Sequence, residues 1–454
     1  MYRNLLIIIV LAGSLSGILY LKPWKNEPES FVLIQDRLPN GDLIGQTNVL
    51  TLSQSLSKTL FYYKLPFRDF ISPDFLLSQG KSYGLDLQAP VYFFLNEEDH
   101  DFEELGLLLN IRDSSKVREG IEHFLKFIEI QDTTLYNTPV SFSPKERIYM
   151  AYSNDWMFIY KGDDFQKNLY RIRHAKQNDV STRWRDFMNE NCLKGRSIIA
   201  QLKTKELNDY GIESTVVSLS NDSSNFILNA NIKQYDSILI DIRPTSPMFS
   251  KQEFSENTIN VSLNIDRLRR HKNDPIYKAI TKLSKKIHFP LAQFLDVWGG
   301  DFAFRQGGIQ TIREKYVTSE LDDNFNVTEV TKYKDVVVSG FSLYLSTLKE
   351  NSPFLQTLFE RGIMNKEDKK VRLLFSHPMN LKNTDSSMVF YTGSYTPKLY
   401  TDSTNKIMWT VNKTPVSIYL DSTDLHSLYC RVHVPLKKLI YDNLSLNEST
   451  RVNN

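Results

Sequence analysis

Seventeen consecutive residues near the start of the chain, Leu5–Leu21, carry no charge, and they constrain the architecture most. As a helix they would be roughly 25 Å long at about 1.5 Å per residue, close to the hydrocarbon thickness of a bilayer. Arg3 precedes the stretch, and Lys22 and Lys25 follow it. The sequence therefore predicts a single-pass N-terminal membrane anchor with an extracytoplasmic main domain. A cleaved export leader and a buried N-terminal helix are the alternatives.

The remaining chain has the composition of a globular protein. Of its 454 residues, 41% are hydrophobic and 24% are charged, which is not typical of disorder. The net charge of +2 provides no global field that would favour nucleic acid as a partner. The two cysteines, Cys192 and Cys430, do not make a disulfide framework. They form either one long-range bridge or two separate thiols.

A weak internal duplication runs through the chain. Asn48–Leu56 and Asn260–Leu268 each predict a strand leading into a helix start. Gly106–Ile128 and Gly340–Ile363 each predict a strand, a polar break and an amphipathic helix. Each half then closes with a pair of strands near a tryptophan. Because residue identity between the halves is low, chance similarity is the alternative.

From this order we predict an α+β fold of two similar halves, each an antiparallel sheet covered by helices, after an N-terminal transmembrane helix. The expected divisions are a membrane segment, a first α+β unit, a middle helix and sheet segment, a second α+β unit and a polar tail, at residues 1–25, 31–165, 166–256, 257–436 and 437–454.

Two glycine turns carry a resemblance to a known kind of protein. Gly84-Leu85-Asp86 and Trp298-Gly299-Gly300-Asp301 occupy corresponding places in the two halves. With the apolar N-terminus, this layout resembles the uncharacterised duplicated proteins of bacterial cell envelopes, which are known by domain-of-unknown-function labels. The resemblance covers residues 31 to about 435. It implies a periplasmic or otherwise extracytoplasmic α+β scaffold, and it provides no catalytic residues.

The motifs expected of an enzyme are missing. Neither a G-x-S-x-G nucleophile elbow nor an H-E-x-x-H zinc motif occurs. We therefore assign no catalytic residue, no metal ligand and no cofactor. The acidic run Asn96–Glu104 lacks the glycine and the ligand order of a calcium loop. It is interpreted as a charged hairpin loop.

The best candidate interaction site is a basic segment in the second half. Asp274 and Pro275 there predict a capped helix start, with Ile276, Ile280, Leu283 and Ile287 on its apolar face. A set of basic side chains on and before this helix is predicted to bind an anionic lipid or an envelope polymer: Arg267, Arg269, Arg270, Lys278, Lys282, Lys285 and Lys286. The alternative is a solvated face on a helix packed against the core.

These observations favour a non-enzymatic envelope protein with a binding or scaffolding role and a protein partner. An envelope hydrolase or transferase with a non-contiguous active site is the alternative. A structural subunit of a secretion or motility machine is a third possibility. A concave cleft that holds a serine, a histidine or a carboxylate pair would favour the enzyme, and an apolar groove without them would favour binding.

Overall fold

The computed structural model describes most of the chain, and its fold divides into two compact units. The first unit comprises Met1–Gly41, Lys81–Asp86 and Tyr92–Glu190, and the second comprises the rest. The described residues are 32–62, 72–98, 101–124, 130–189, 197–222, 224–235, 241–250, 255–286, 289–321, 325, 327–348, 351–365, 379–393, 397–411 and 414–435.

The first unit is a six-stranded antiparallel sheet with helices, in which the hairpin β2–β3 lies beside the four-stranded meander β4–β7. Its sheet has the order β2-β3-β7-β6-β5-β4. Its elements are η1 (Ile34–Arg37), β2 (Val91–Glu98), β3 (Asp101–Asn110), α4 (Ser114–Phe124), β4 (Gln131–Leu135), β5 (Thr138–Ser143), β6 (Ile148–Tyr152), β7 (Trp156–Lys161), α5 (Phe165–His174) and α6 (Thr182–Asn189). Since β2 and β3 pair directly, the predicted hairpin around Asn96–Glu104 is confirmed.

Aromatic side chains form the core of the first unit. The rings of Phe94, Phe158 and Phe165 lie in near-parallel pairs with centroids about 6 Å apart. Trp184 is fully buried, and its indole nitrogen donates to the carbonyl of Pro39 over 2.7 Å. A large buried ring therefore finds the polar partner that its N–H requires.

The second unit contains most of the strands. Its elements are β1 (Leu43–Thr47), α2 (Val49–Tyr62), α3 (Pro73–Ser82, which crosses the unit boundary), β8 (Ile198–Leu202), α7 (Lys205–Asp209), β9 (Ile212–Asn221), β10 (Asn225–Gln234), β11 (Asp241–Ile242), β12 (Ser246–Phe249), β13 (Ser255–Asn264), α8 (Asp266–Arg270), α9 (Pro275–Lys286), α10 (Leu291–Val297), β14 (Trp298–Leu321), β15 (Val327–Thr347), α11 (Ser352–Glu360), β16 (Asn380–Thr384), β17 (Ser387–Tyr391), β18 (Leu399–Asp402), β19 (Asn405–Val411), β20 (Thr414–Thr423) and β21 (Ser427–Pro435).

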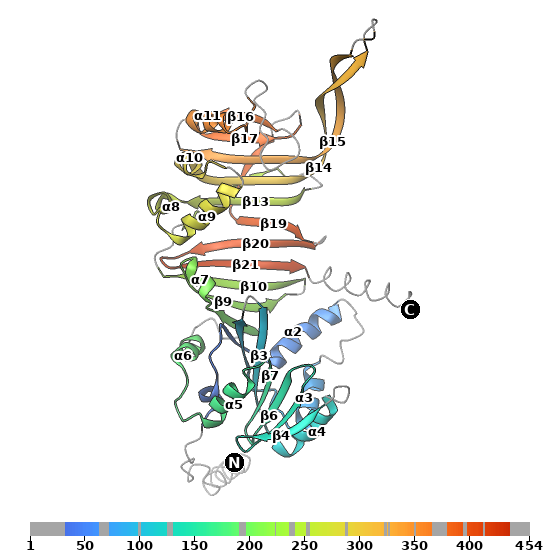
Figure 1. Ribbon diagram of the computed structural model, residues 1–454, viewed down its shortest axis with the longest axis vertical. Coiled ribbons are helices and arrows are strands. Elements are labelled where there is room, and N and C mark those ends of the chain that lie inside the picture. Colours follow the sequence, from blue (N-terminus) through green and yellow to red (C-terminus); the bar gives the residue numbers. More distant parts are fainter. Residues whose placement is uncertain are drawn as a thin grey trace, which may run out of the picture. The chain divides into compact units, whose positions relative to one another are not determined.

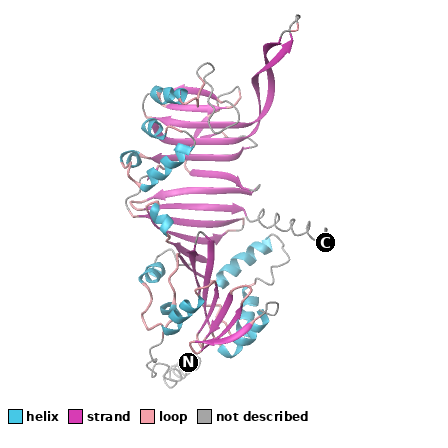
Figure 2. Ribbon diagram, viewed as in Figure 1, coloured by secondary structure: helices cyan, strands magenta, loops and turns pink. Residues whose placement is uncertain are grey.

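Twelve of these strands form one continuous antiparallel run, which Figure 1 and Figure 2 show as a ladder of strands. The order is β1-β8-β9-β10-β21-β20-β19-β13-β14-β15-β17-β16. β12 and β18 pair separately as a two-stranded sheet. The strands nearest the C-terminus thus lie in the middle of the run, between β10 and β13.

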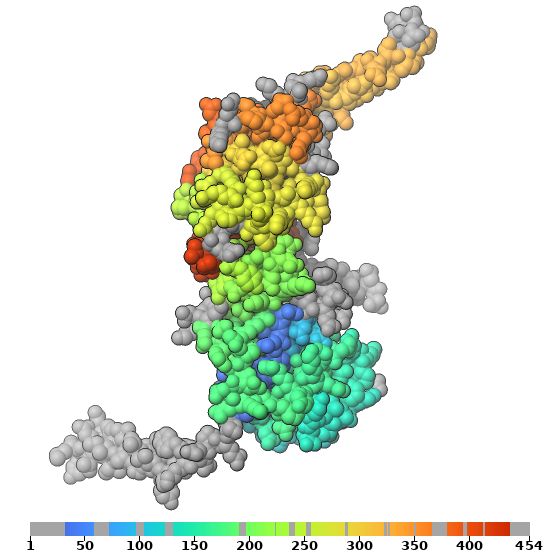
Figure 3. Space-filling view, turned by 60° about the vertical axis from the view of Figure 1, so that its left-hand side comes forward, coloured from blue at the N-terminus to red at the C-terminus, as the bar shows by residue number. Residues whose placement is uncertain are grey.

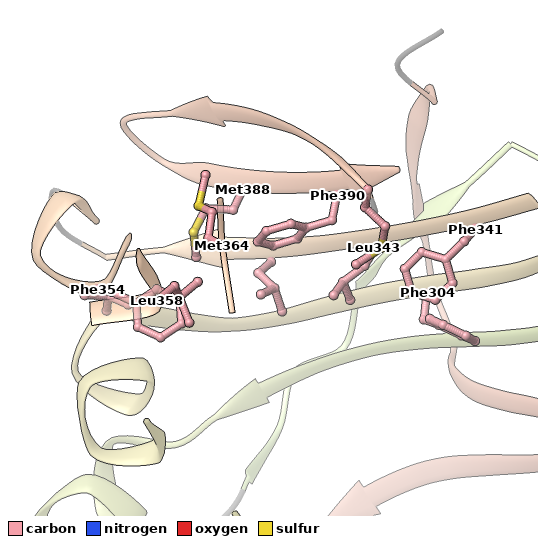
Figure 4. Close-up of a cluster of buried hydrophobic side chains, with 11 residues drawn as sticks. Phe304, Phe341, Leu343, Phe354, Leu358, Met364, Met388 and Phe390 are labelled. Atoms are coloured by element: carbon pink, nitrogen blue, oxygen red, sulfur yellow. The ribbon is translucent and has the colours of Figure 1, made fainter. Parts of the chain in front are cut away.

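The two faces of the β13–β17 part of this sheet are covered differently. One face packs under α10 and α11, where Phe304, Leu343, Phe354, Leu358 and Phe390 form a buried cluster (Figure 4). The other face lies against the small β12–β18 sheet, whose Phe249 packs on Ala303 of β14 and Val389 of β17. Side chains alternate along each strand, so the sequence of β14 serves both layers.

The outer halves of β14 and β15 pair with each other as a two-stranded arm that extends past the sheet (Figure 1 and Figure 3). The ladder shifts register between Gln306 and Ile309 where the arm begins. Ile309, Val317 and Val337 on the arm are more than half exposed. The arm therefore contributes little to the core of its unit.

The expectation of two similar halves is wrong. In the described residues the strands form a six-stranded sheet in one unit and a twelve-stranded run in the other, and the run is not a copy of the six-stranded sheet. The second predicted α+β unit is not closed on itself, since β21 pairs with β10 from the middle segment and β18 pairs with β12. The physical reason is that local patterns define strands but not their partners.

The expectation of an N-terminal anchor with an extracytoplasmic main domain is also corrected. Among the described residues the longest helix is α2, with 14 residues, and no described helix is both long and apolar enough to cross a bilayer. The stretch Leu5–Leu21 itself lies outside the described residues. We therefore withdraw that architecture and localisation.

Gly106 provides a test of packing in the first unit. It lies directly opposite Phe94 in the β2–β3 ladder, and a Cβ there would approach the Phe94 ring to 2.2 Å. We expect Gly106→Ala to lower the free energy of unfolding by about 2 kcal/mol, the usual cost of overpacking. Urea unfolding followed by the fluorescence of the buried Trp156 and Trp184 measures it.

The Phe94→Ala background is the matched control. Removing the ring makes room for the new methyl group, so Gly106→Ala should cost less than half as much there. Equal costs in both backgrounds would show that the ring does not enforce glycine at this position.

A candidate ligand cleft around a buried arginine

The alternation of β14 places a charged side chain on the face that meets the small sheet. Phe302 and Phe304 point toward the helix-covered face, and Ala303 and Arg305 point the opposite way. Arg305 lies between Thr258 of β13 and Ser342 of β15 in the ladder. The strand β14 therefore directs one guanidinium into the layer between the two sheets.

A cleft of about 650 Å³ opens where the small β12–β18 sheet meets β13, β14, β19 and β20. This volume falls within the range of about 300–1,000 Å³ that is usual for small-molecule sites. The lining combines apolar residues with polar ones and two cations: Met248, Phe249, Ser250, Thr258, Asn260, Phe304, Arg305, Asp402, Thr404, Lys406, Met408 and Tyr419.

Arg305 is held firmly in the wall of the cleft. Its Nη1 donates to the carbonyl oxygen of Ser250 over 2.7 Å, and its Nη2 donates to Oγ of Ser342 over 3.3 Å. The guanidinium carbon lies 5.5 Å from the centroid of the Phe249 ring. The residue is only 6% exposed. Neutral groups thus fix the orientation of the guanidinium and engage two of its five N–H donors.

Within the described residues, the charge of Arg305 is not paired with a carboxylate. Burial lowers the pKa of its guanidinium from the ordinary value, and no carboxylate in the described part of the chain is recorded as opposing that effect. A guanidinium still stays protonated, because its intrinsic pKa lies far above neutral pH. Buried charges in proteins are normally paired, and among the described residues this one is held by neutral groups alone.

Lys406 adds a second cation to the cleft. It faces Asn260 of β13 and Tyr419 of β20 across the ladder, and its Nζ lies 5.1 Å from the centroid of the Tyr419 ring. Arg431 of β21 lies 5.6 Å from the same ring and forms a two-pronged ion pair with Asp421. The aromatic ring therefore positions Lys406, while Arg431 is already neutralised.

The cleft does not contain the constellation that would favour an enzyme. Asp402 is the single carboxylate among the lining residues, and it accepts a hydrogen bond of 3.0 Å from Thr404 Oγ1. Among the described lining residues, Ser250 is the single serine, and none is a histidine or a cysteine. The lining therefore lacks both a carboxylate pair and a nucleophile with a base beside it.

A neighbouring pocket of about 300 Å³ has a different character. Arg243 there pairs with Asp301 over 3.3 Å and donates to the carbonyl of Leu263 over 2.6 Å. Asp241 accepts a hydrogen bond from Thr423. Its charged groups satisfy one another, so this pocket needs no ligand charge, unlike the Arg305 cleft.

The structure separates the predicted basic site into two kinds of residue. Arg269 has an internal role: its guanidinium donates to the carbonyls of Leu295 and Trp298 at the end of α10 and pairs with Asp266. Arg270 donates to the carbonyl of Asp266, and Arg267 also has a recorded interaction. Arg269 therefore stabilises the end of α10, Arg270 stabilises the turn of α8, and Arg267 is exposed on α8.

The lysines of α9, in contrast, lie at the surface. Lys278, Lys282, Lys285 and Lys286 are all exposed and lie close to one side of the helix at spacings of three and four residues. The predicted start is confirmed, since Asp274 Oδ1 accepts from the backbone N–H of Ile276 over 2.7 Å. Leu283, expected on the buried face, is 62% exposed. Ile276 and Ile280 make the contacts with the core.

One of the two cysteines lies among the described residues. Cys430 is a free thiol whose pKa is raised by burial, and Cys192 lies outside the described residues. No group of three histidine, cysteine, aspartate or glutamate side chains suited to a metal ion occurs in the part of the chain that the structure describes.

Comparison with known proteins leaves the family open. No family model matches the chain, and no curated protein matches it. Among solved structures, crystal form I of TP0453 aligns with a TM-score of 0.30 at 9% identity, over 47% of this chain and 82% of that one. Crystal form III aligns with a TM-score of 0.31 at 11% identity, over 45% and 80%. Similarity at this level carries no argument about fold or function.

Proposed function

We propose that the chain is a binding protein whose cleft takes a small amphipathic anion. The observation that carries the proposal is Arg305, a buried and oriented guanidinium in the wall of a cleft, with no carboxylate partner among the described residues. An anionic group in the cleft would supply the missing counter-charge through charge-assisted hydrogen bonds.

The lining also supports an apolar body for this ligand. Met248, Phe249 and Met408 line the cleft beside the two cations, and methionine side chains adapt to irregular shapes. An acyl or aryl group of moderate size would displace water from these surfaces. The ligand class is therefore a carboxylate or similar anion joined to an apolar chain or ring.

Binding without turnover fits the cleft better than hydrolysis or group transfer. Catalysis needs a nucleophile or an acid–base pair within reach of the bound group. Asp402 lacks a second carboxylate beside it in the lining, and Ser250 contributes its backbone oxygen to Arg305. The polar groups of the cleft can orient a ligand and select its charge, as in small-molecule binding sites.

Decanoate is a suitable probe, because it joins a carboxylate to a ten-carbon chain. We expect calorimetric titration of the full chain to show binding of decanoate, and Arg305→Met to weaken it at least tenfold, since a charge-assisted hydrogen bond contributes about 1.5–3 kcal/mol. Lys406→Met should weaken binding less, since Lys406 is not as deeply buried.

Arg313→Met is the matched control, because Arg313 lies on the exposed arm of the same strand β14. It should leave decanoate binding unchanged. Decanol, which lacks the charge, should bind the wild-type chain at least tenfold more weakly than decanoate. Equal affinity of Arg305→Met and wild type for decanoate would refute the anion site.

The stability of Arg305→Met without ligand gives a second test. Removing an uncompensated buried charge is favourable, while the loss of the bonds to Ser250 and Ser342 is unfavourable. We expect the two effects to offset each other to within about 1 kcal/mol in urea unfolding. A loss above about 3 kcal/mol would indicate that Arg305 is a structural residue with its charge already satisfied.

We propose as a second candidate function that the lysine stripe of α9 binds an anionic surface. The supporting observation is that Lys278, Lys282, Lys285 and Lys286 are exposed and have no recorded ion pair in the described residues. Exposed lysines near anionic headgroups each contribute on the order of 1 kcal/mol, and salt weakens the attraction.

Co-sedimentation with phosphatidylglycerol vesicles tests the stripe. We expect the full chain to sediment with these vesicles at low salt, and the triple change of Lys282, Lys285 and Lys286 to glutamate to abolish this. A triple change of Arg313, Lys315 and Lys334 to glutamate on the arm is the control with equal charge. Binding that ignores the α9 changes, or ignores salt, would remove this candidate.

A further inference from the structure

One face of the second unit's sheet is apolar beyond the point where its helix layer ends. The face under α10 and α11 continues through Ile259 of β13 to Ile407 of β19, its direct neighbour in the ladder. Trp409 of β19 stacks on Phe304 of the covered cluster, with ring centroids 6.0 Å apart. The covered core and the next four strands thus share one continuous apolar surface.

The register of β10, β21, β20 and β19 aligns these side chains. Residues directly opposite each other in an antiparallel ladder point to the same side. Thirteen uncharged apolar residues therefore share this face: Phe226, Leu228, Ala230, Ile232, Leu428, Cys430, Val432, Val434, Val416, Ile418, Leu420, Ile407 and Trp409. We call them the open face.

No residue of the open face reaches the burial of the core. All thirteen are half-buried or exposed, with Leu228 37% and Trp409 41% exposed, although they lie on interior strands. None of them belongs to a buried core cluster recorded for the described residues. The opposite side of the same strands carries polar groups such as Lys406, Ser417 and Arg431. A contiguous apolar face that is not buried by its own chain's described residues is typical of an interaction site.

The dimensions of the open face indicate what can cover it. Four strands at about 4.8 Å spacing present a surface roughly 19 Å wide. A single helix is about 10 Å across, so one helix covers about half of it. A second sheet, packed face to face, matches the width, as in β-sandwiches. The occupant is therefore a broad apolar sheet face rather than one helix.

We propose that the open face of one copy packs against the open face of a second copy. The face carries no charge, so two copies related by a twofold axis bury no unpaired charge against each other. Each copy carries this face, so a second copy supplies an apolar sheet face of the same width. Thirteen residues are about half of the 20 to 30 that a standard interface uses on each side, which suits the apolar core of a dimer.

Co-capture of two differently tagged full-length copies tests the proposal. We expect the wild-type copies to be captured together. Ile418→Lys, which places a charge at the centre of the open face opposite Ile407 and Val432, should reduce co-capture at least tenfold. Ser417→Lys, one residue earlier on the polar side of β20, is the matched control and should leave co-capture unchanged. Circular dichroism of both variants checks that they fold.

The thiol of Cys430 gives an independent readout, because it lies on the open face. In a Cys192→Ser background, maleimide should label Cys430 slowly at high protein concentration and faster on dilution, and Ile418→Lys should label fast. A monomer whose Cys430 stays protected would show that a segment of the same chain covers the face. A monomer that labels freely, or that carries bound lipid there, would equally overturn the dimer.

Discussion

The pairing of β10 with β21 is the contact on which the second unit depends. Nine residue pairs, from Asn225 opposite Pro435 to Lys233 opposite Ser427, join segments that are about two hundred residues apart in the chain. Closing so long a loop costs conformational entropy. The burial and hydrogen bonds of the whole run must offset this loss of entropy. Without this contact, β1, β8, β9 and β10 would be separated from the strands that carry the cleft, because the described link between them runs through β21, β20 and β19.

That contact also explains why local patterns in the sequence did not lead to the topology. Several local inferences were correct: the strand and helix in each of Gly106–Ile128 and Gly340–Ile363, the hairpin at Asn96–Glu104, and the cap at Asp274. Gly84 and Gly300 also serve alike, since each has positive φ and approaches a carbonyl oxygen so closely that a Cβ would lie 2.0 Å from it. These features repeat because hairpins and strand–helix turns have common local solutions. The choice of strand partner depends on distant segments, and periodicity does not record it.

The candidate site was missed for a related reason. Arg305 follows Phe302, Ala303 and Phe304 in a strand-like run, and a charged residue at an inward position of such a strand is a usable signal. To tell which face of the strand points inward, however, one must know the layer that covers it, and the β12–β18 sheet is built from segments about 150 residues apart.

The basic segment was easier to find because its charges are contiguous. The run of charges did not show that Arg269 donates to a carbonyl at the end of α10, while the lysines remain at the surface. Likewise, the alternation in β10 correctly predicts a strand with an apolar side. No local sequence pattern indicates that this side is left uncovered by the described layers.

The cleft and the open face meet in a single strand. Lys406 and Met408 of β19 line the cleft, and Ile407 and Trp409, the residues between and after them, lie on the open face. Side-chain alternation makes this unavoidable, because a strand with one layer on each side contributes every second residue to each. A ligand in the cleft and a second copy on the open face would therefore contact the same backbone from opposite sides. Any effect of the dimer on ligand affinity must equal, as a free energy, the effect of the ligand on dimer affinity. The short β13–β19 ladder of three residue pairs is where such coupling would act, since it joins the uncovered strands to the packed core.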